Sequence, residues 1–457
     1  MHMTENLDYF ACPLPEDVAR LVAAGEYERG KRVIALRMSD PKVPEAVKKR
    51  LQLELQIIRE LPGYYTHPEE EMLALLQAQV QGMTREEMET LRDDGTLDWI
   101  YREGAVFYKT DACENLIKTR PDMASRFLDQ EALAQKAENI RMLDEAIAGM
   151  KRNGGAHWRY RMKTTIAIAP HAQRPGELIR VHMTLPLQDG QSYPGEIITW
   201  PQAKHVAAID HPQRTAFFEA EYEPGMTFSS EFSWEIKAPY AAPVPEAVSA
   251  QQPDFDTGEM LPQIHFTPFI RALVKELAGE ESNPLIKARR FYDYITTQCC
   301  YRFVPAYFTK TNIPEYFGAG QRGDCGMHAL LFITLCRCAG IPAQWQAGLY
   351  TRPGSVGNHD WARFYIAPYG WLYCDSSFGG SAYREGHLDR WNFYFANLEP
   401  FRLVANRDIQ QVFDPPYPFL RQDPYDNQDG EVSYQDEGLR RGDYSISREM
   451  LSWEKIL

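Results

Sequence analysis

The fold of this chain is decided by one stretch, GDCGMHALLFITLCRCAG, which covers residues 323–340. Its polar start is typical of a short loop, and the apolar run that follows is typical of a buried helix. Gly340, followed by Ile341-Pro342, is typical of a helix C-terminus. The pattern therefore predicts a helix that begins at Cys325, and a helix this apolar needs other elements packed around it.

Cys325 lies where a helix start can change the chemistry of a thiol. Unpaired backbone N–H groups and the positive end of the helix dipole stabilise an anion, and the thiolate is the reactive form of cysteine. We therefore expect Cys325 to have thiolate character and to act as a nucleophile. The alternative for a single cysteine is a small apolar packing residue, which is our interpretation of Cys336, Cys338 and Cys374.

Two side chains downstream could complete a catalytic set. Residues 358–375 alternate as two strands joined by a turn at Pro368-Tyr-Gly370, which predicts a hairpin with His359 and Asp375 on neighbouring strands. A carboxylate that holds one imidazole nitrogen leaves the other nitrogen to take a thiol proton. Cys325, His359 and Asp375 are therefore the candidates for a Cys-His-Asp triad.

The three blocks around these residues resemble the transglutaminase-like superfamily, which shares the papain-like core of cysteine enzymes. The matching motifs are Gly-Asp-Cys at 323–325 with Ala-Gly-Ile-Pro-Ala at 339–343, His-x-Trp at 359–361, and Gly-Trp-x-x-x-Asp at 370–375. The blocks occur in the family's order, and the similarity covers roughly residues 265–385. The resemblance implies that Cys325 is the nucleophile, His359 the general base and then acid, Asp375 the orienting carboxylate, and the acyl-enzyme a thioester.

An acyl-transfer site also needs donors for the oxyanion that forms on the substrate carbonyl. The backbone N–H of Cys325 is the first expected donor. Gln321 and Tyr301 are candidates for a second donor or for the cleft because they are close to Cys325 in sequence, and an ordinary polar or packing role is the alternative for both. Trp361 is expected to form a wall of the cleft.

No metal or cofactor is expected at this site. His328 follows Cys325 by one helical turn, so His328 could be a rival base or could bind a metal together with Asp324 and Cys325. A metal would need further ligands at fixed spacing, and the sequence offers none nearby. We therefore interpret His328 as a packing residue.

The remaining sequence divides by its hydrophobic period. Helical spacing runs to about residue 153, with the spacing of a capping box at 84–87, and alternation with a period of two begins near 154. We predict a multidomain chain with an N-terminal all-α domain at 1–153, a middle antiparallel β-sandwich at 154–240 and a proline-rich linker at 241–262. A C-terminal α+β transglutaminase-like (papain-like) catalytic domain is expected at 263–400. For the C-terminal extension at 401–457 we prefer a position on the surface, and the alternative is a segment that wraps the core and forms a wall of the substrate cleft.

Composition limits the partners and the location. The formal net charge of -14, with no basic run longer than residues 48–50, makes nucleic acid an unexpected partner. No apolar stretch approaches the length of a bilayer span. Eight cysteines without a regular framework indicate a reducing compartment, and the first fifteen residues lack the basic and apolar regions of a signal peptide. We expect a cytoplasmic chain without a membrane partner; its oligomeric state stays open.

These observations predict cysteine-dependent amide chemistry on a peptide or protein substrate. Hydrolysis, as in a peptidase or amidase, is preferred because no residue in the sequence indicates a cleft that favours an amine over water. The alternatives are a protein-glutamine acyltransferase that crosslinks proteins, and a binding or scaffold protein that retains the fold without catalysis.

Overall fold

The computed structural model describes residues 7–304 and 306–457, which fall into two compact units. Unit 1 comprises the described residues of 7–141 and 302–311, and unit 2 comprises 142–301 and 312–457. Residues 1–6, which begin the segment expected to lack a signal peptide, lie outside the described residues. None of the helices in the described part of the chain is long and apolar enough to cross a membrane.

Unit 1 is mainly helical, but it also contains a small sheet, so the prediction of an all-α domain is wrong. The capping box is present, because the Thr84 side chain accepts a hydrogen bond from the Glu87 backbone N–H at 3.2 Å. A hairpin that turns at Glu103-Gly104, where both residues have positive φ, joins β2 to β3. These strands belong to a small sheet of strand order β1-β3-β2, which the helical spacing of the surrounding sequence did not predict. The elements are α2 (Glu16–Ala23), α3 (Tyr27–Ser39), α4 (Glu45–Tyr64), β1 (His67–Pro68), α5 (Glu69–Gln79), α6 (Arg85–Asp93), β2 (Trp99–Arg102), β3 (Ala105–Tyr108) and α7 (Ala112–Thr119).

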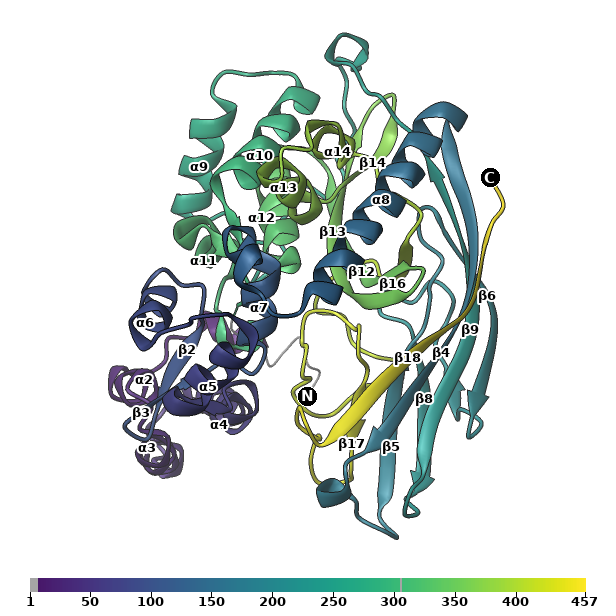
Figure 1. Cartoon of the computed structure of the whole chain (residues 1–457). Helices are drawn as coiled ribbons and strands as arrows, with labels where there is room; N and C mark the ends of the chain where they lie inside the picture. Colours follow the sequence, from purple (N-terminus) through teal and green to yellow (C-terminus); the bar gives the residue numbers. More distant parts are fainter. Residues whose placement is uncertain (1–6, 305) are drawn as a thin grey trace. The chain divides into compact units, whose positions relative to one another are not determined.

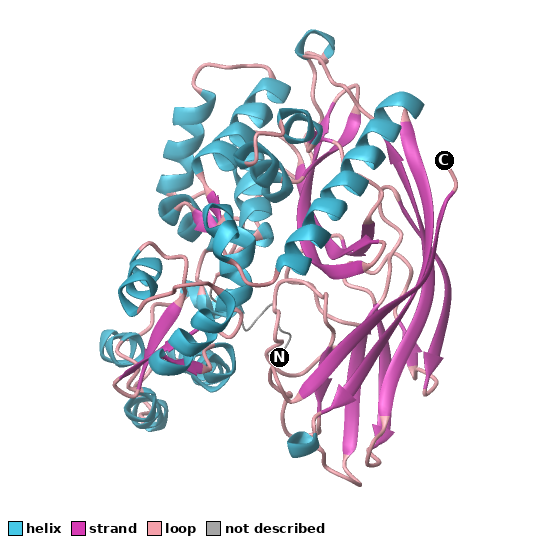
Figure 2. Ribbon diagram, viewed as in Figure 1, coloured by secondary structure: helices cyan, strands magenta, loops and turns pink. Residues whose placement is uncertain are grey.

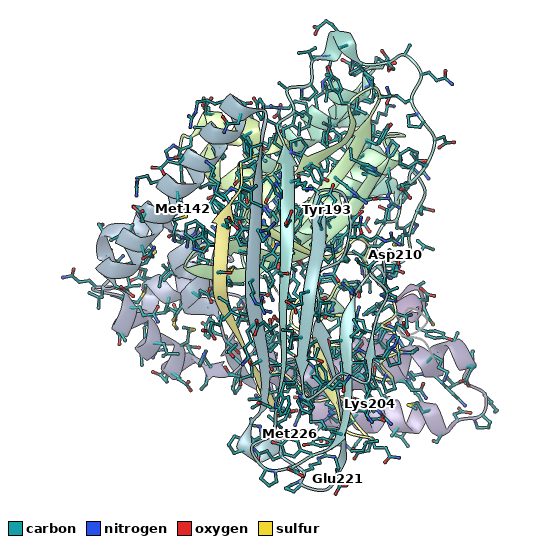
Figure 3. The ribbon with its side chains drawn as sticks, turned by 90° about the vertical axis from the view of Figure 1, so that its right-hand side faces the viewer. Met142, Tyr193, Lys204, Asp210, Glu221 and Met226 are labelled. Atoms are coloured by element: carbon teal, nitrogen blue, oxygen red, sulfur yellow. The ribbon has the colours of Figure 1, made fainter. Side chains whose placement is uncertain are left out.

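Unit 2 contains two four-stranded sheets of orders β18-β4-β9-β6 and β17-β5-β8-β7 (Figures 1 and 2). Helix α8 (Gln130–Asn153) leads into the first of these, whose outer face is turned to the viewer in Figure 3, where Tyr193 of β6 is labelled. Phe232 and Trp234 of β9 are buried while Glu235 on the outer face pairs with Arg159, as the alternation predicts. The strands are β4 (Gly155–Ile168), β5 (Leu178–Thr184), β6 (Ser192–Trp200), β7 (His205–Val206), β8 (Thr215–Glu221), β9 (Thr227–Pro239), β17 (Glu431–Ser433) and β18 (Tyr444–Lys455).

The segment 401–457, expected as a surface extension, is instead woven into unit 2. Strand β16 (Arg402–Asn406) pairs with β12, β17 pairs with β5, and β18 pairs with β4 from Tyr444 to Lys455. Without β18, the backbone groups along one side of β4 would have no partner strand. The C-terminal segment is therefore part of the sheets rather than an addition to them.

The rest of unit 2 is a five-stranded antiparallel sheet of order β15-β14-β13-β12-β16 with a group of helices beside it (Figure 1). Helix α12 packs on β13, where the rings of Phe332 and Phe364 lie 5.5 Å apart. The elements are α9 (Pro268–Ala278), α10 (Pro284–Gln298), β10 (Cys300–Tyr301), α11 (Ile313–Gly320), β11 (Arg322–Gly323), α12 (Cys325–Cys338), β12 (Ala343–Arg352), β13 (Ser355–Ile366), β14 (Gly370–Cys374), α13 (Ser376–Arg384), α14 (Leu388–Phe393) and β15 (Phe395–Ala396).

Candidate active site

Cys325 is the first residue of α12, which confirms the predicted helix start. Asp324 caps this helix, because its side chain accepts a hydrogen bond from the backbone N–H of Met327 at 3.3 Å. Gly323 is required immediately before the cap, since a Cβ there would lie 2.6 Å from the Phe317 ring and 2.8 Å from Met327. A glycine at position 323 therefore lets the chain pass close to Phe317 and Met327 just before the helix begins at Cys325.

His359 and Asp375 form a buried hydrogen-bonded pair. Nε2 of His359 lies 2.7 Å from Oδ2 of Asp375, and both side chains are almost completely buried. Asp375 directly follows β14 and caps α13, because its Oδ1 accepts from the Phe378 backbone N–H at 2.9 Å. The predicted hairpin of β13 and β14 thus brings the two residues together, and Nδ1 is left as the imidazole nitrogen that can take a proton from a thiol.

The Cys325 thiol contacts the residue after His359. Its Sγ donates a hydrogen bond to Oδ2 of Asp360 at 3.3 Å. Consecutive residues of a strand point to opposite faces, and Asp360 shares the face of Phe364, which packs on α12. Within the described residues, no hydrogen bond joins Cys325 to His359. The structure therefore pairs His359 with Asp375, while the Cys325 thiol contacts the opposite face of β13 through Asp360.

The surroundings of Cys325 disfavour the thiolate that the helix start predicts. Burial raises the pKa of the Cys325 thiol well above its ordinary value, and the negative charges of Asp360 and Asp324 raise it further. The helix dipole alone is too weak to offset both effects. Both effects favour the neutral thiol in this arrangement.

Asp360 belongs to a buried group of carboxyls, together with Asp423 and Asp426 of the C-terminal segment. Burial raises the pKa of all three, and the side chains of Asp423 and Asp426 hydrogen-bond each other. Gln428 donates from Nε2 to Oδ1 of Asp360 and, at 3.2 Å, to the backbone oxygen of His359. The C-terminal segment thus contacts the strand that carries the candidate base.

Arg402 contacts the other side of the pair. Its Nη2 lies 2.9 Å from Oδ2 of Asp375, and both side chains are fully buried. Across β12, Tyr350 is the partner of Arg402 in β16, so Arg402 lies on the same face of the sheet as His359. Burial alone would raise the pKa of Asp375, but its interactions with His359 and Arg402 outweigh burial and hold this pKa well below its ordinary value.

Sequence reasoning missed both Asp360 and Arg402. A signal existed for Asp360, because it is the charged member of an otherwise apolar face that includes Ala362, Phe364 and Ile366. Arg402 stands between apolar residues in a strand that is buried along its whole length. Charged residues at such positions are rarely buried without a partner. Their partners, however, lie far away in the sequence.

The three further candidate residues have different surroundings. The Tyr301 side chain hydrogen-bonds Cys325, and burial raises its pKa well above its ordinary value, so this hydroxyl keeps its proton beside the thiol. Gln321 is exposed, with φ 53° at the end of α11, and its side chain hydrogen-bonds Tyr294, which gives its oxyanion role no support. Trp361 is buried, with its ring 6.0 Å from that of His359 and its Nε1 donating to Gln346 at 2.9 Å.

His328 is packed rather than placed to exchange protons. Its ring stacks on Phe317 with centroids 4.7 Å apart. Burial lowers the pKa of His328 to about 3, so the imidazole is neutral near pH 7. Over residues 7–304 and 306–457, no group of three or more His, Cys, Asp or Glu side chains is arranged to hold a metal ion.

Comparison with known proteins agrees with the motif-based resemblance. Residues 271–376, which include Cys325, His359 and Asp375, match the family model of the transglutaminase-like superfamily, so the resemblance is confirmed. No curated protein matches the chain. Among solved structures, a protein assigned as a cysteine protease from Cytophaga hutchinsonii is 13% identical, with a TM-score of 0.37, over 65% of this chain and 91% of that one. The periplasmic domain of TgpA from Pseudomonas aeruginosa is 16% identical, with a TM-score of 0.25, over 54% of this chain and 96% of that one.

Proposed function

We propose that this chain, whose residues 271–376 carry the transglutaminase-like core, is an enzyme that cleaves an amide bond of a peptide or protein through a cysteine thioester. The observation that supports this most strongly is the buried His359–Asp375 pair, 2.7 Å apart, because His359 lies on β13 and the next residue of that strand, Asp360, contacts the Cys325 thiol. A base held by a buried carboxylate, on a strand that also contacts the thiol, supports this proposal, because nucleophilic cysteine catalysis needs such a base within reach of the thiol.

The proposed reaction begins with transfer of the thiol proton to Nδ1 of His359, while Nε2 stays on Asp375. The thiol must first exchange its hydrogen bond with Asp360 for one with His359. The Cys325 thiolate then adds to the amide carbon, and the oxyanion takes a hydrogen bond from the Cys325 backbone N–H. His359 gives its proton to the leaving amine as the C–N bond breaks and the thioester forms.

Hydrolysis completes the proposed cycle. His359 removes a proton from a water molecule, the hydroxyl adds to the thioester, and the C–S bond breaks to release the acid and the Cys325 thiol. If an amine takes the place of water, the same residues perform acyl transfer and form a new amide. Hydrolysis is preferred because water is always at hand, whereas acyl transfer needs a cleft that favours an amine over water.

The test incubates the full chain with a panel of glutamine-containing peptides and a fluorescent primary amine. Release of ammonia or of peptide fragments would support hydrolysis, while incorporation of the amine without release would replace hydrolysis with acyl transfer. Cys325→Ala should abolish either product. Cys338→Ala, which removes a partly buried thiol from the other end of α12, is the matched control and should leave the activity intact.

A non-catalytic binding protein would give neither product. If all peptides are left unchanged, and iodoacetamide at pH 9 labels wild type and Cys325→Ala to the same extent, the nucleophile assignment is withdrawn.

We further propose that the enzyme works in the cytoplasm. All eight cysteines are free, which suits a reducing compartment. Recovery of the native protein from the periplasmic fraction of its own cells would contradict this location.

A further inference from the structure

Asp375 shares one of its oxygens between an imidazole and a guanidinium. Oδ2 lies 2.7 Å from Nε2 of His359 and 2.9 Å from Nη2 of Arg402. Oδ1 accepts from the Phe378 backbone N–H at 2.9 Å and from the Ser377 hydroxyl at 3.1 Å. Four groups therefore hold this carboxylate, and one of them is a guanidinium that the triad motifs do not contain.

The guanidinium of Arg402 is itself held firmly. Glu399 accepts from its Nε at 2.7 Å and from its Nη2 at 2.9 Å, and neither side chain is exposed. The rings of Trp361, Phe378 and Tyr350 lie 5.0, 5.0 and 5.4 Å from its central carbon. A planar guanidinium suits this setting, because it can donate to two carboxylates and pack against rings at once, whereas an ammonium is a single compact charge.

We propose that Arg402 is a positioning residue of the Cys-His-Asp site, which fixes Oδ2 of Asp375 and takes up part of its negative charge so that His359 can both accept and release a proton. This inference rests on the proposed function, since it assigns Arg402 a role in that same site. A buried carboxylate with no second positive partner would hold a proton on the imidazole too strongly, and the base must return that proton to the leaving amine.

The groups around His359 support this balance of charge. Asp375 and Glu399 supply two negative charges and Arg402 one positive charge, so protonation of His359 makes the group neutral. Tyr350 and Tyr394 are the titratable neighbours, and burial raises the pKa of both well above neutrality, so they stay uncharged. On the opposite face of β13, Asp360 is the nearest acid in sequence.

The test is the NMR titration of the His359 imidazole in the full chain, with ¹³C-labelled histidine and with His359→Gln to assign the signal. In Arg402→Met, we expect the imidazole to lose its proton at a higher pH than in wild type, because Asp375 and Glu399 then act on it unopposed. Glu399→Gln should shift the titration in the opposite direction. Arg402→Lys should return part of the wild-type value.

Controls separate this role from a merely structural one. Arg337→Lys changes another buried arginine of unit 2, whose Nε donates to the Ala343 backbone oxygen at 2.7 Å, and should leave the titration unchanged. On an Asp375→Asn background, Arg402→Met should add a smaller shift than in wild type, because Glu399 alone is then left unopposed. If Arg402→Met does not fold, Glu399→Gln and Arg402→Lys carry the test.

The proposal is overturned if folded Arg402 and Glu399 variants titrate His359 as wild type does, or shift it in the same direction. The imidazole titration needs no substrate, so it remains decisive if no peptide is cleaved and the proposed function fails. If peptides are cleaved, Arg402→Met should lower kcat about tenfold or more with little change in KM, since Arg402 acts on the base rather than on substrate binding.

Discussion

Asp360 is the residue that most changes the chemistry of Cys325. It stands next to the candidate base in β13 but points to the other face, where it accepts the hydrogen bond of the thiol at 3.3 Å. Burial favours the neutral forms of both groups, and the negative charge of Asp360 raises the pKa of the thiol further. Asp360, which belongs to the same strand as the expected base His359, therefore disfavours the thiolate form of Cys325.

Replacement of Asp360 by Asn should therefore make Cys325 more reactive. The substitution keeps the shape and removes a negative charge that raises the pKa of the thiol, so a larger fraction is thiolate at neutral pH. We expect the rate of iodoacetamide alkylation of Cys325 at pH 7 to rise about tenfold, as one unit of pKa would give. Mass spectrometry of the peptide that contains Cys325 measures this rate.

Asp389→Asn is the control, because Asp389 lies in the same unit with a fully solvated side chain, and it should leave the rate unchanged. An unchanged rate in folded Asp360→Asn would mean that burial alone restrains the thiol.

At the scale of elements, β16 connects the site to the C-terminal segment. Gly348 of β12 pairs with His359 of β13 on one side and with Val404 of β16 on the other. A Cβ at this position would lie 2.1 Å from the Leu403 backbone oxygen, which no small adjustment can relieve. The strand carrying Arg402 can dock only because residue 348 has no side chain.

Gly348→Ala should displace β16 and lower the free energy of unfolding by about 1–3 kcal/mol, as overpacking commonly does. Chemical unfolding followed by tryptophan fluorescence measures the loss. Gly357→Ala is the matched control, because Gly357 also lies in the sheet but has nothing within 4 Å of its added Cβ. Equal stability of the two variants would contradict the docking of β16 against β12.

The sequence predicted the local elements well where the signal was local. The start of α12 at Cys325, the hairpin of β13 and β14, and the buried face of β9 follow from caps, turn residues and alternation. Strands β16, β17 and β18 were missed because their partners are far away: Tyr444 pairs with Ile168, for example. The alternation of a strand does not show which distant strand it pairs with, so pairing over such sequence separations could not be predicted.

At the scale of the whole molecule, unit 2 carries buried acids whose pKa values are shifted in opposite directions. Asp360, Asp423 and Asp426 have raised pKa values, so their contribution to stability is complete below the ordinary Asp range and is lost as the pH rises through their raised values. The lowered pKa of Asp375 acts the other way, because its contribution is present above the ordinary range and is lost only in strong acid.

Asp426→Asn should therefore become more stable relative to wild type as the pH rises. At pH 4 the two proteins should differ least, and at pH 9 the variant should gain about 1–2 kcal/mol because it has no carboxyl to ionise in the buried group. Urea unfolding at both pH values measures the difference. Asp389→Asn should show no such trend, and a gap that narrows toward high pH would contradict the raised pKa of Asp426.

The sequence by itself determined the nucleophile block, the order of the three motifs and the family resemblance, because each depends on residues close together in the chain. It also identified His359 and Asp375, whose pairing follows from a short hairpin. Only the tertiary structure decided that Cys325 contacts Asp360, that Arg402 holds Asp375, and that the last strands complete the sheets. The physical reason is that buried charges are balanced by whichever groups the fold brings near. Gln428 and Asp360, for example, are 68 residues apart.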